Sequence, residues 1–138
     1  DFGCTNTITL ADDEFLVVYG VNHVASGKAT YSSVNVYASD QAKLSIGGID
    51  DRDFAHTADP YLPGDPAADL MYVYQASRNC GSSPNCLPLS ITNCPRLNLG
   101  DNTLLGVIFR AYLEPATKVG PPMQEVLYDR VIKFSPRP

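Results

Sequence analysis

The chain has 138 residues, 44% of them hydrophobic and 18% charged, which is a composition typical of one globular domain with its own core. Its net charge of −5 argues against binding to nucleic acid, because contacts with phosphates need a basic face. The longest apolar runs, Phe15–Tyr19 and Leu104–Phe109, are far shorter than the roughly 20 residues of a membrane-spanning helix. We therefore expect a single domain over residues 1–138 with no membrane span.

Eight segments alternate apolar and polar residues with period two, and they are rich in β-branched and aromatic residues, as strands are. In chain order they are Thr5–Leu10, Phe15–Val21, Ala29–Ala38, Lys43–Ile46, Met71–Ser77, Leu87–Thr92, Thr103–Leu113 and Glu125–Phe134. The alternation predicts an all-β fold, namely an antiparallel β-sandwich of Greek-key or jelly-roll type with about eight strands. The apolar face of Thr103–Leu113 is almost unbroken, so we expect this segment to be the central core strand.

The segments between the strands are rich in turn residues, and only one of them contains a helix start. Asp65 precedes Pro66, which is the order of an N-cap residue and a first helical residue, and it predicts one helical turn before Met71. The connection from Ile49 to Asp69 is long enough to be a functional loop.

Four cysteines indicate the compartment. Cys80 and Cys86 enclose five residues of turn-forming type, so we expect a disulfide between them and a second one between Cys4 and Cys94. A four-thiolate zinc site is the alternative, but its usual paired C-x-x-C spacing is absent. Two disulfides predict a secreted or cell-surface protein, and because no targeting segment precedes Asp1 we interpret the chain as mature.

The connection from residue 49 to residue 69 is acidic and offers a candidate metal site. Its aspartates include Asp50, Asp51, Asp53 and Asp59, and carboxylate oxygens are the ligands that calcium prefers. The EF-hand spacing is absent and Arg52 lies within the cluster, so a solvated loop whose aspartates cap turns is the alternative that we favour. Calcium is the one cofactor that the sequence leaves open.

Two groups of residues are candidates for binding. The first is polar and comes from the ends of predicted strands, and its members are Asn22, His23, Lys28, Arg110 and Glu114. The second consists of tyrosines on single faces of two strands, Tyr31 and Tyr37 with Tyr72 and Tyr74. Structural ion pairs and cross-strand packing are the alternatives for the two groups. A ligand pocket, a surface glycan and a protein partner are the binding roles considered.

Catalytic motifs are absent from the sequence. It contains no G-x-S-x-G, no H-E-x-x-H and two histidines, His23 and His56, so a secreted hydrolase that pairs one of them with a carboxylate is the second hypothesis. Residues 1–69 hold 11 acidic and 3 basic residues, whereas residues 70–138 hold 4 and 7, which favours head-to-tail self-association if the halves map to molecular ends. We expect first a non-catalytic extracellular module that binds a partner or assembles, by strand addition or by head-to-tail packing.

Overall fold

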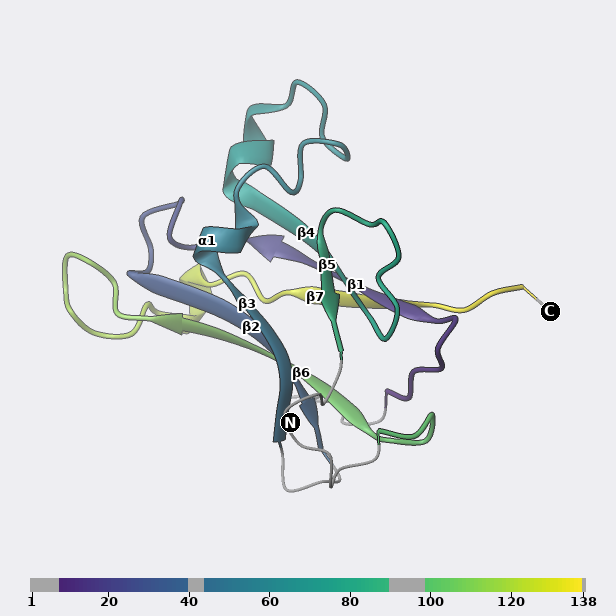
Figure 1. The fold of residues 1–138 in the computed structure, drawn as a ribbon. Coiled ribbons are helices and arrows are strands. Elements are labelled where there is room, and N and C mark those ends of the chain that lie inside the picture. The colour runs from purple at the N-terminus through teal and green to yellow at the C-terminus, as the bar shows by residue number, and fades with distance from the viewer. Residues whose placement is uncertain (1–7, 40–43, 90–98, 138) are drawn as a thin grey trace.

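The computed structural model describes residues 8–39, 44–89 and 99–137, and within them seven strands form two sheets (Figure 1). The strands are β1 (Phe15–Val21), β2 (Tyr31–Ala38), β3 (Leu44–Asp50), β4 (Met71–Ser77), β5 (Cys86–Pro88), β6 (Leu105–Tyr112) and β7 (Arg130–Phe134). One short helix, α1 (Asp51–Phe54), and two 3₁₀ turns, Pro66–Leu70 and Met123–Glu125, complete the regular elements of the described residues. A mostly β fold with two sheets is therefore confirmed.

The two sheets differ in how their strands run. One has the order β3-β2-β6 and is antiparallel throughout, and the other has the order β5-β4-β1-β7. In the second sheet β5 pairs with β4 in parallel, so the prediction of purely antiparallel pairing is wrong at this place. The chain leaves β4 at Ser77 and folds back along it, and Gln75 N then donates to Asn85 O at 2.8 Å, which starts β5 in the direction of β4.

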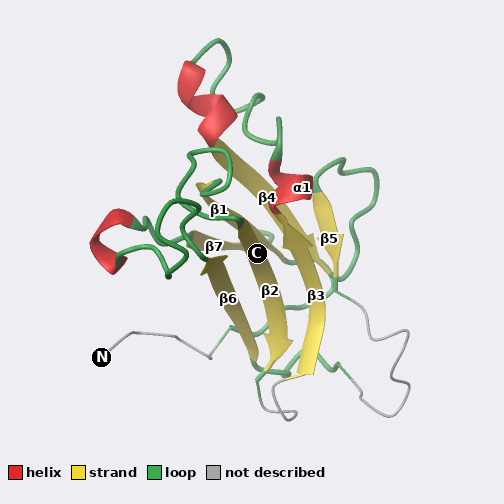
Figure 2. Ribbon diagram, turned by 90° about the vertical axis from the view of Figure 1, so that its left-hand side faces the viewer, coloured by secondary structure: helices red, strands yellow, loops and turns green. Residues whose placement is uncertain are grey.

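The two sheets lie one over the other (Figure 2), and their buried side chains form a shared core. One cluster joins Leu16 and Ala76 of the four-stranded sheet to Val36 and Leu105 of the three-stranded sheet. A second cluster contains Val18, Val34, Ile49, Phe54 and Tyr72. In β2 the residues Val34, Val36 and Ala38 alternate with more exposed positions, as the predicted half-buried strand requires.

Most predicted strands lie where the alternation places them. The bounds of β1 and β4 match the prediction at both ends, whereas β3 is longer than Lys43–Ile46 and β7 is shorter than Glu125–Phe134. In place of the start of that predicted strand, Glu125 ends a 3₁₀ turn and residues 126–129 have no regular structure. Of the predicted strand Thr5–Leu10, residues 5–7 lie outside the described residues, and Ile8 forms an isolated antiparallel bridge to Leu105.

The strand β6 is not central, which corrects the prediction for Thr103–Leu113. It lies at the edge of its sheet and pairs with β2 alone among the named strands. Its first two residues are buried, but Val107, Phe109 and Ala111 are only partly buried. An apolar face fixes which side of a strand meets the core, and it does not fix the position of the strand in the sheet.

Two predictions that rest on residues close together in the sequence are confirmed. Asp65 caps the 3₁₀ turn at Pro66–Leu70, with its side chain accepting from Ala67 N at 2.9 Å. Cys80 and Cys86 form the predicted disulfide, with their Cα atoms 5.7 Å apart. Cys4 and Cys94 lie outside the described residues. In the part of the chain that the structure describes, no helix is long and apolar enough to cross a membrane.

Candidate functional site

Two of the predicted binding residues build the turn that follows β1. The Asn22 side-chain oxygen accepts from the backbone N–H groups of Val24 and Ala25, both at 3.1 Å. His23 is buried, and its Nε2 lies 3.3 Å from Leu127 O. Its ring packs against Phe109 with centroids 5.7 Å apart. Both side chains therefore stabilise the loop, and His23 also joins it to the connection between β6 and β7.

A second link to the same connection is ionic. Lys28 Nζ lies 3.7 Å from Glu114 Oε1 and donates directly to Glu125 Oε2. The hydrogen bond to Glu125 raises the pKa of Lys28, and the charge of Glu114 adds to it. The structure thus brings Asn22, His23, Lys28 and Glu114 to one end of the molecule. Glu125 belongs to this group, although it lies 97 residues from Lys28.

Arg110 does not join this group. Its guanidinium lies 5.7 Å from the centroid of the Tyr37 ring, which is a cation–π contact on the outer surface of β2 and β6. The expectation that Arg110 meets an acid is replaced by this contact with an aromatic ring. The sequence places Tyr37 on a predicted strand. Only the register of β2 against β6 brings its side chain and that of Arg110 together.

The four candidate tyrosines do not form one exposed surface. Tyr31 is 39% exposed and its ring packs at 5.5 Å against that of Tyr112 on the neighbouring strand. Tyr72 is fully buried and stacks on Phe54 at 4.0 Å, and Tyr74 is partly buried against the second core cluster. A binding role on the surface is therefore available to Tyr31 and Tyr112, whereas Tyr72 serves the core.

Three of the four candidate metal ligands have hydrogen-bond partners within the protein. Asp50 caps α1 and pairs with Arg52, Asp53 accepts from Asp50 N, and Asp51 accepts from Ser32 N. The fourth, Asp59, lies with His56 and Asp69, and one ligand atom from each falls within 4.8 Å of the others. All three side chains are exposed, and the calcium site stays a prediction.

One buried acid escaped the sequence reasoning. Both carboxylate oxygens of Asp129 are buried against Gly20 and Tyr72, and within the described residues no hydrogen bond of normal geometry reaches them or the Tyr72 hydroxyl. Burial raises the pKa of Asp129 to about 7, and interaction with the Tyr72 hydroxyl offsets part of this effect. Asp129 lies between two exposed residues in the sequence, so no local pattern signals it.

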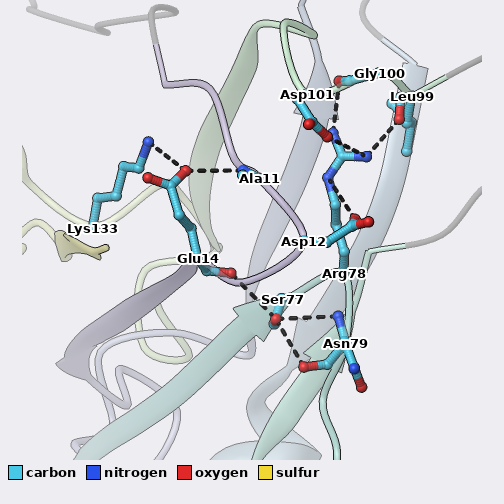
Figure 3. Close-up of polar contacts among 10 residues, drawn as sticks. All are labelled: Ala11, Asp12, Glu14, Ser77, Arg78, Asn79, Leu99, Gly100, Asp101 and Lys133. Atoms are coloured by element: carbon cyan, nitrogen blue, oxygen red, sulfur yellow. Dashed lines mark hydrogen bonds and ion pairs between the residues drawn. The ribbon is translucent and has the colours of Figure 1, made fainter. Parts of the chain in front are cut away.

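The attachment of β7 depends on another acid near the start of β1. Glu14 accepts from Lys133 Nζ at 2.7 Å and from Ala11 N at 2.9 Å (Figure 3). Ser135 Oγ donates to the other oxygen at 2.5 Å. The hydrogen bond with Lys133, followed by those with Ser135 and Ala11, lowers the pKa of Glu14 to about 2. Glu14 is therefore ionised at neutral pH and joins β1 to β7.

The exposed apolar side chains gather in one stretch of the chain. Of the thirteen large hydrophobic residues that are exposed in the described part, ten belong to β6, β7 and their flanks. They are Leu104, Ile108, Tyr112, Leu113, Val119, Met123, Leu127, Tyr128, Ile132 and Phe134. We call this stretch, residues 104–134, the β6–β7 side. Exposed apolar residues scattered singly are common on protein surfaces, and these ten are close to one another in the sequence.

The β6–β7 side also contains two edge strands, β6 and β7. Tyr112 O accepts from Thr30 N, and Leu104 O accepts from Ser39 N, so even-numbered residues of β6 bond toward β2. Successive residues of a strand alternate in this respect, and Val107, Phe109 and Ala111 therefore direct their N–H and C=O groups away from the sheet. Among the described residues, no named strand pairs with this side of β6, and Ile8 forms only an isolated bridge to Leu105 there.

Comparison with known proteins adds little. No family model matches the chain, and no curated protein matches it either. Among solved structures, that of an uncharacterized protein from Burkholderia cenocepacia is similar over 96% of this chain, with 14% identity and a TM-score of 0.45. The similarity covers 34% of that protein, so the chain spans about a third of its length. A likeness at this level identifies no function.

Proposed function

We propose that the protein is a non-catalytic extracellular module that binds an extended segment of a protein partner, or of further copies, through the β6–β7 side. The observation that carries the proposal is the presence there of ten exposed large apolar side chains, beside an edge of β6 that no other named strand of the described residues covers. A large exposed apolar surface lowers the solubility of a monomer, and an interface that covers it is one reason for its presence. An open edge is a template for one more strand.

The chemistry of strand addition fits the β6 edge. A partner strand would receive main-chain hydrogen bonds from Val107, Phe109 and Ala111, which supply affinity, and its alternate side chains would supply specificity. Val107 and Phe109 pack against the core clusters and are only partly buried. Inward-facing apolar side chains of the added strand would cover these two, while outward-facing ones would meet Ile108 and Tyr112.

The proposal includes the fold type and the location. The fold is a β-sandwich of Greek-key or jelly-roll type, and the protein is secreted or lies at a cell surface. The Cys80–Cys86 disulfide supports this compartment, because such bonds persist outside reducing environments. The contacts of Lys28 with Glu114 and Glu125, and of His23 with Leu127, support the proposed interaction surface. They hold the connection between β6 and β7 in place, so that its apolar side chains are presented on an ordered surface.

A secreted hydrolase is the second candidate, and one exposed pair favours it. His56 Nδ1 lies 3.3 Å from Asp59 Oδ2, which is the base and carboxylate pairing that hydrolytic sites use. His56 also has a backbone φ of 63°, a conformation that is uncommon for residues other than glycine. This candidate differs from the first because it requires His56, whereas the interaction module does not.

Two matched substitutions test the proposed interaction module. Val107→Lys places a charge on the inward-facing side of the β6 edge, and Ile108→Lys places the same charge on the outer face. The probe is the synthetic peptide Lys-Thr-Val-Thr-Val-Thr-Val-Lys, and its binding is measured by fluorescence anisotropy. Because an inward charge on an edge strand blocks pairing, we expect binding to the wild type and to Ile108→Lys and at least tenfold weaker binding to Val107→Lys.

Amide hydrogen exchange locates the bound peptide. The edge-facing amides of Val107 and Phe109 should gain protection when the peptide is added, because each then donates to the new strand. Equal peptide binding by the two lysine variants, or added protection that lies elsewhere, would contradict strand addition at β6.

A further inference from the structure

His56, Asp59 and Asp69 form a cluster of metal-ligating side chains away from β6 and β7. They belong to the connection between α1 and β4, which projects beyond the sheets (Figure 1). One ligand atom from each of the three falls within 4.8 Å of the other two, and His56 Nδ1 lies 3.3 Å from Asp59 Oδ2. Two ligands at about 2.1 Å from a tetrahedral zinc ion are about 3.4 Å apart. The distance between His56 and Asp59 therefore suits two ligands of one ion.

The chemistry of the three ligands favours a transition metal over calcium. Calcium takes about six to eight ligands, all of them oxygen, whereas the imidazole nitrogen of His56 suits zinc and its neighbours among the first-row metals. Of the four aspartates that the sequence predicts as calcium ligands, only Asp59 belongs to the cluster. One nitrogen and two carboxylates, with a further position left to water, match the three-ligand zinc sites of proteins.

The backbone next to each ligand is anchored to the rest of the fold. Thr57 is buried, and its hydroxyl accepts from Val73 N of β4 at 3.1 Å. Ala58 is fully buried, and its carbonyl accepts from two N–H groups of the turn that follows. Leu70 O, one residue after the third ligand, accepts from Asn22 N at 2.8 Å. The ligands are thus positioned before an ion binds, which reduces the entropy lost on binding.

An open hollow of about 500 Å³ borders the cluster. Two of the three ligands line it, so an ion held by the cluster would face a space that admits water or a small ligand. The surroundings are acidic, because residues 50–69 hold six aspartates and the single arginine among them pairs with Asp50. Such a charge attracts cations. The residues that line the hollow include Asp59, Leu62, Pro63, Asp65 and Asp69.

We propose that His56, Asp59 and Asp69 bind one zinc ion through three protein ligands, with a further coordination position open to the hollow. The site goes beyond the interaction module, which makes no use of this connection. It takes the pair of residues on which the hydrolase candidate depends, and it assigns the pair to a metal. A bound ion would also link the segment after α1 to the 3₁₀ turn before β4, and so stabilise the folded chain.

Calorimetric titration of the full chain with zinc chloride, at pH 7 in a buffer that does not coordinate metals, tests the site. We expect one ion per chain for the wild type. His56→Asn and Asp69→Asn should each weaken binding at least tenfold, which corresponds to about 1.4 kcal/mol. Asparagine is chosen at position 56 because it tolerates the positive φ of 63° found there.

Asp65→Asn is the matched control. It removes the same charge from the same hollow, and asparagine retains the ability to cap the 3₁₀ turn. Because Asp65 is not in the ligand cluster, we expect its substitution to change zinc affinity by no more than about twofold. Equal losses for Asp65→Asn and Asp69→Asn would show a diffuse attraction to the acidic connection and would overturn the site.

Thermal unfolding gives a second measurement on the same four proteins. Without zinc their midpoints should agree, because His56, Asp65 and Asp69 are exposed, and this agreement shows that the variants fold. Zinc should raise the midpoint of the wild type and of Asp65→Asn only, and calcium chloride should raise none. Zinc binding that survives both ligand substitutions, a response to calcium, or no binding by the wild type contradicts the proposal. None of these outcomes bears on peptide binding at β6.

Discussion

Asp129 shows how a single buried residue affects the molecule. It begins the approach to β7, and a Cβ on Gly20 of β1 would overlap its Oδ1 atom. Glycine at position 20 is therefore required by a close approach of the carboxyl group. The same approach leaves the carboxylate oxygens away from water and without a hydrogen bond of normal geometry in the described residues, which favours the protonated form.

The charge of Asp129 should make stability depend on pH. Its pKa is about 7 in the folded protein and close to 3.8 in the unfolded chain. Between these values the folded state binds the extra proton, so stability falls as the pH rises from about 4 to about 7. The full penalty, of order 4 kcal/mol, is present above pH 7. We expect Asp129→Asn to remove it, so that the variant gains stability relative to wild type at pH 8 and not at pH 4.

The measurement is urea unfolding at pH 4, 6 and 8. Asp13→Asn, at an exposed position in the turn before β1, is the matched control for the loss of one carboxyl group. A constant difference between Asp129→Asn and wild type over the three pH values would show that the carboxyl group is solvated in the folded protein.

At this scale the sequence predicts only what neighbouring residues determine. The Asp65 cap and the Cys80–Cys86 disulfide depend on spacings of a few residues, and both are confirmed. His23 and Leu127 are 104 residues apart, and no local spacing relates them. Their contact depends on the strand pairing, as the burial of Asp129 against Gly20 does.

Among the elements, Arg78 joins the end of β4 to the segment before β6. Its guanidinium donates to Leu99 O at 2.5 Å and to Gly100 O at 2.6 Å (Figure 3). Asp101 and Asp12 lie 3.9 Å and 4.0 Å from it. The side chain is only 14% exposed, so these contacts are partly shielded from water. They hold two chain segments that share no strand pairing.

Substitution of Arg78 should therefore cost stability. Arg78→Met keeps the aliphatic length and loses both charge-assisted hydrogen bonds, and we expect a loss of about 3 kcal/mol in the free energy of unfolding. Arg78→Lys should recover less than half of it, because one ammonium group does not reproduce the planar fork that reaches both carbonyls. Chemical denaturation at pH 7 measures the two values. Equal stability of the lysine variant and the wild type would indicate that charge alone is sufficient.

The strands themselves were largely predictable, while their order was not. The alternation of apolar and polar residues predicts the first and last residues of β1 and β4 correctly, because each strand has a clear inward face. The same reasoning made β6 central on the strength of its apolar face. In the structure its inward residues beyond Gly106 are half-exposed at an edge. The order of strands follows from connections that cross between the sheets. The period of apolar residues along a strand contains no information about these connections.

For the whole molecule, stability comes mainly from the core that the two sheets share. Both core clusters draw on the two sheets, and the second also takes in Phe54 of α1. The confirmed disulfide is local by comparison, since its cysteines are six positions apart. Of the two expected disulfides, the one in the described residues fixes the loop between β4 and β5, and the Cys4–Cys94 bond stays a prediction.

The cost of removing each pair of cysteines should differ accordingly. Loop entropy assigns about 2 kcal/mol to a bridge across six positions and on the order of 4 kcal/mol to one that joins Cys4 to Cys94. We expect Cys80→Ser with Cys86→Ser to remain folded, with a small fall in thermal midpoint, and Cys4→Ser with Cys94→Ser to lose about twice as much stability. Calorimetry of both variants measures this difference. Loss of folding in the first variant would show that the β4–β5 loop, rather than the shared core, limits the stability of the molecule.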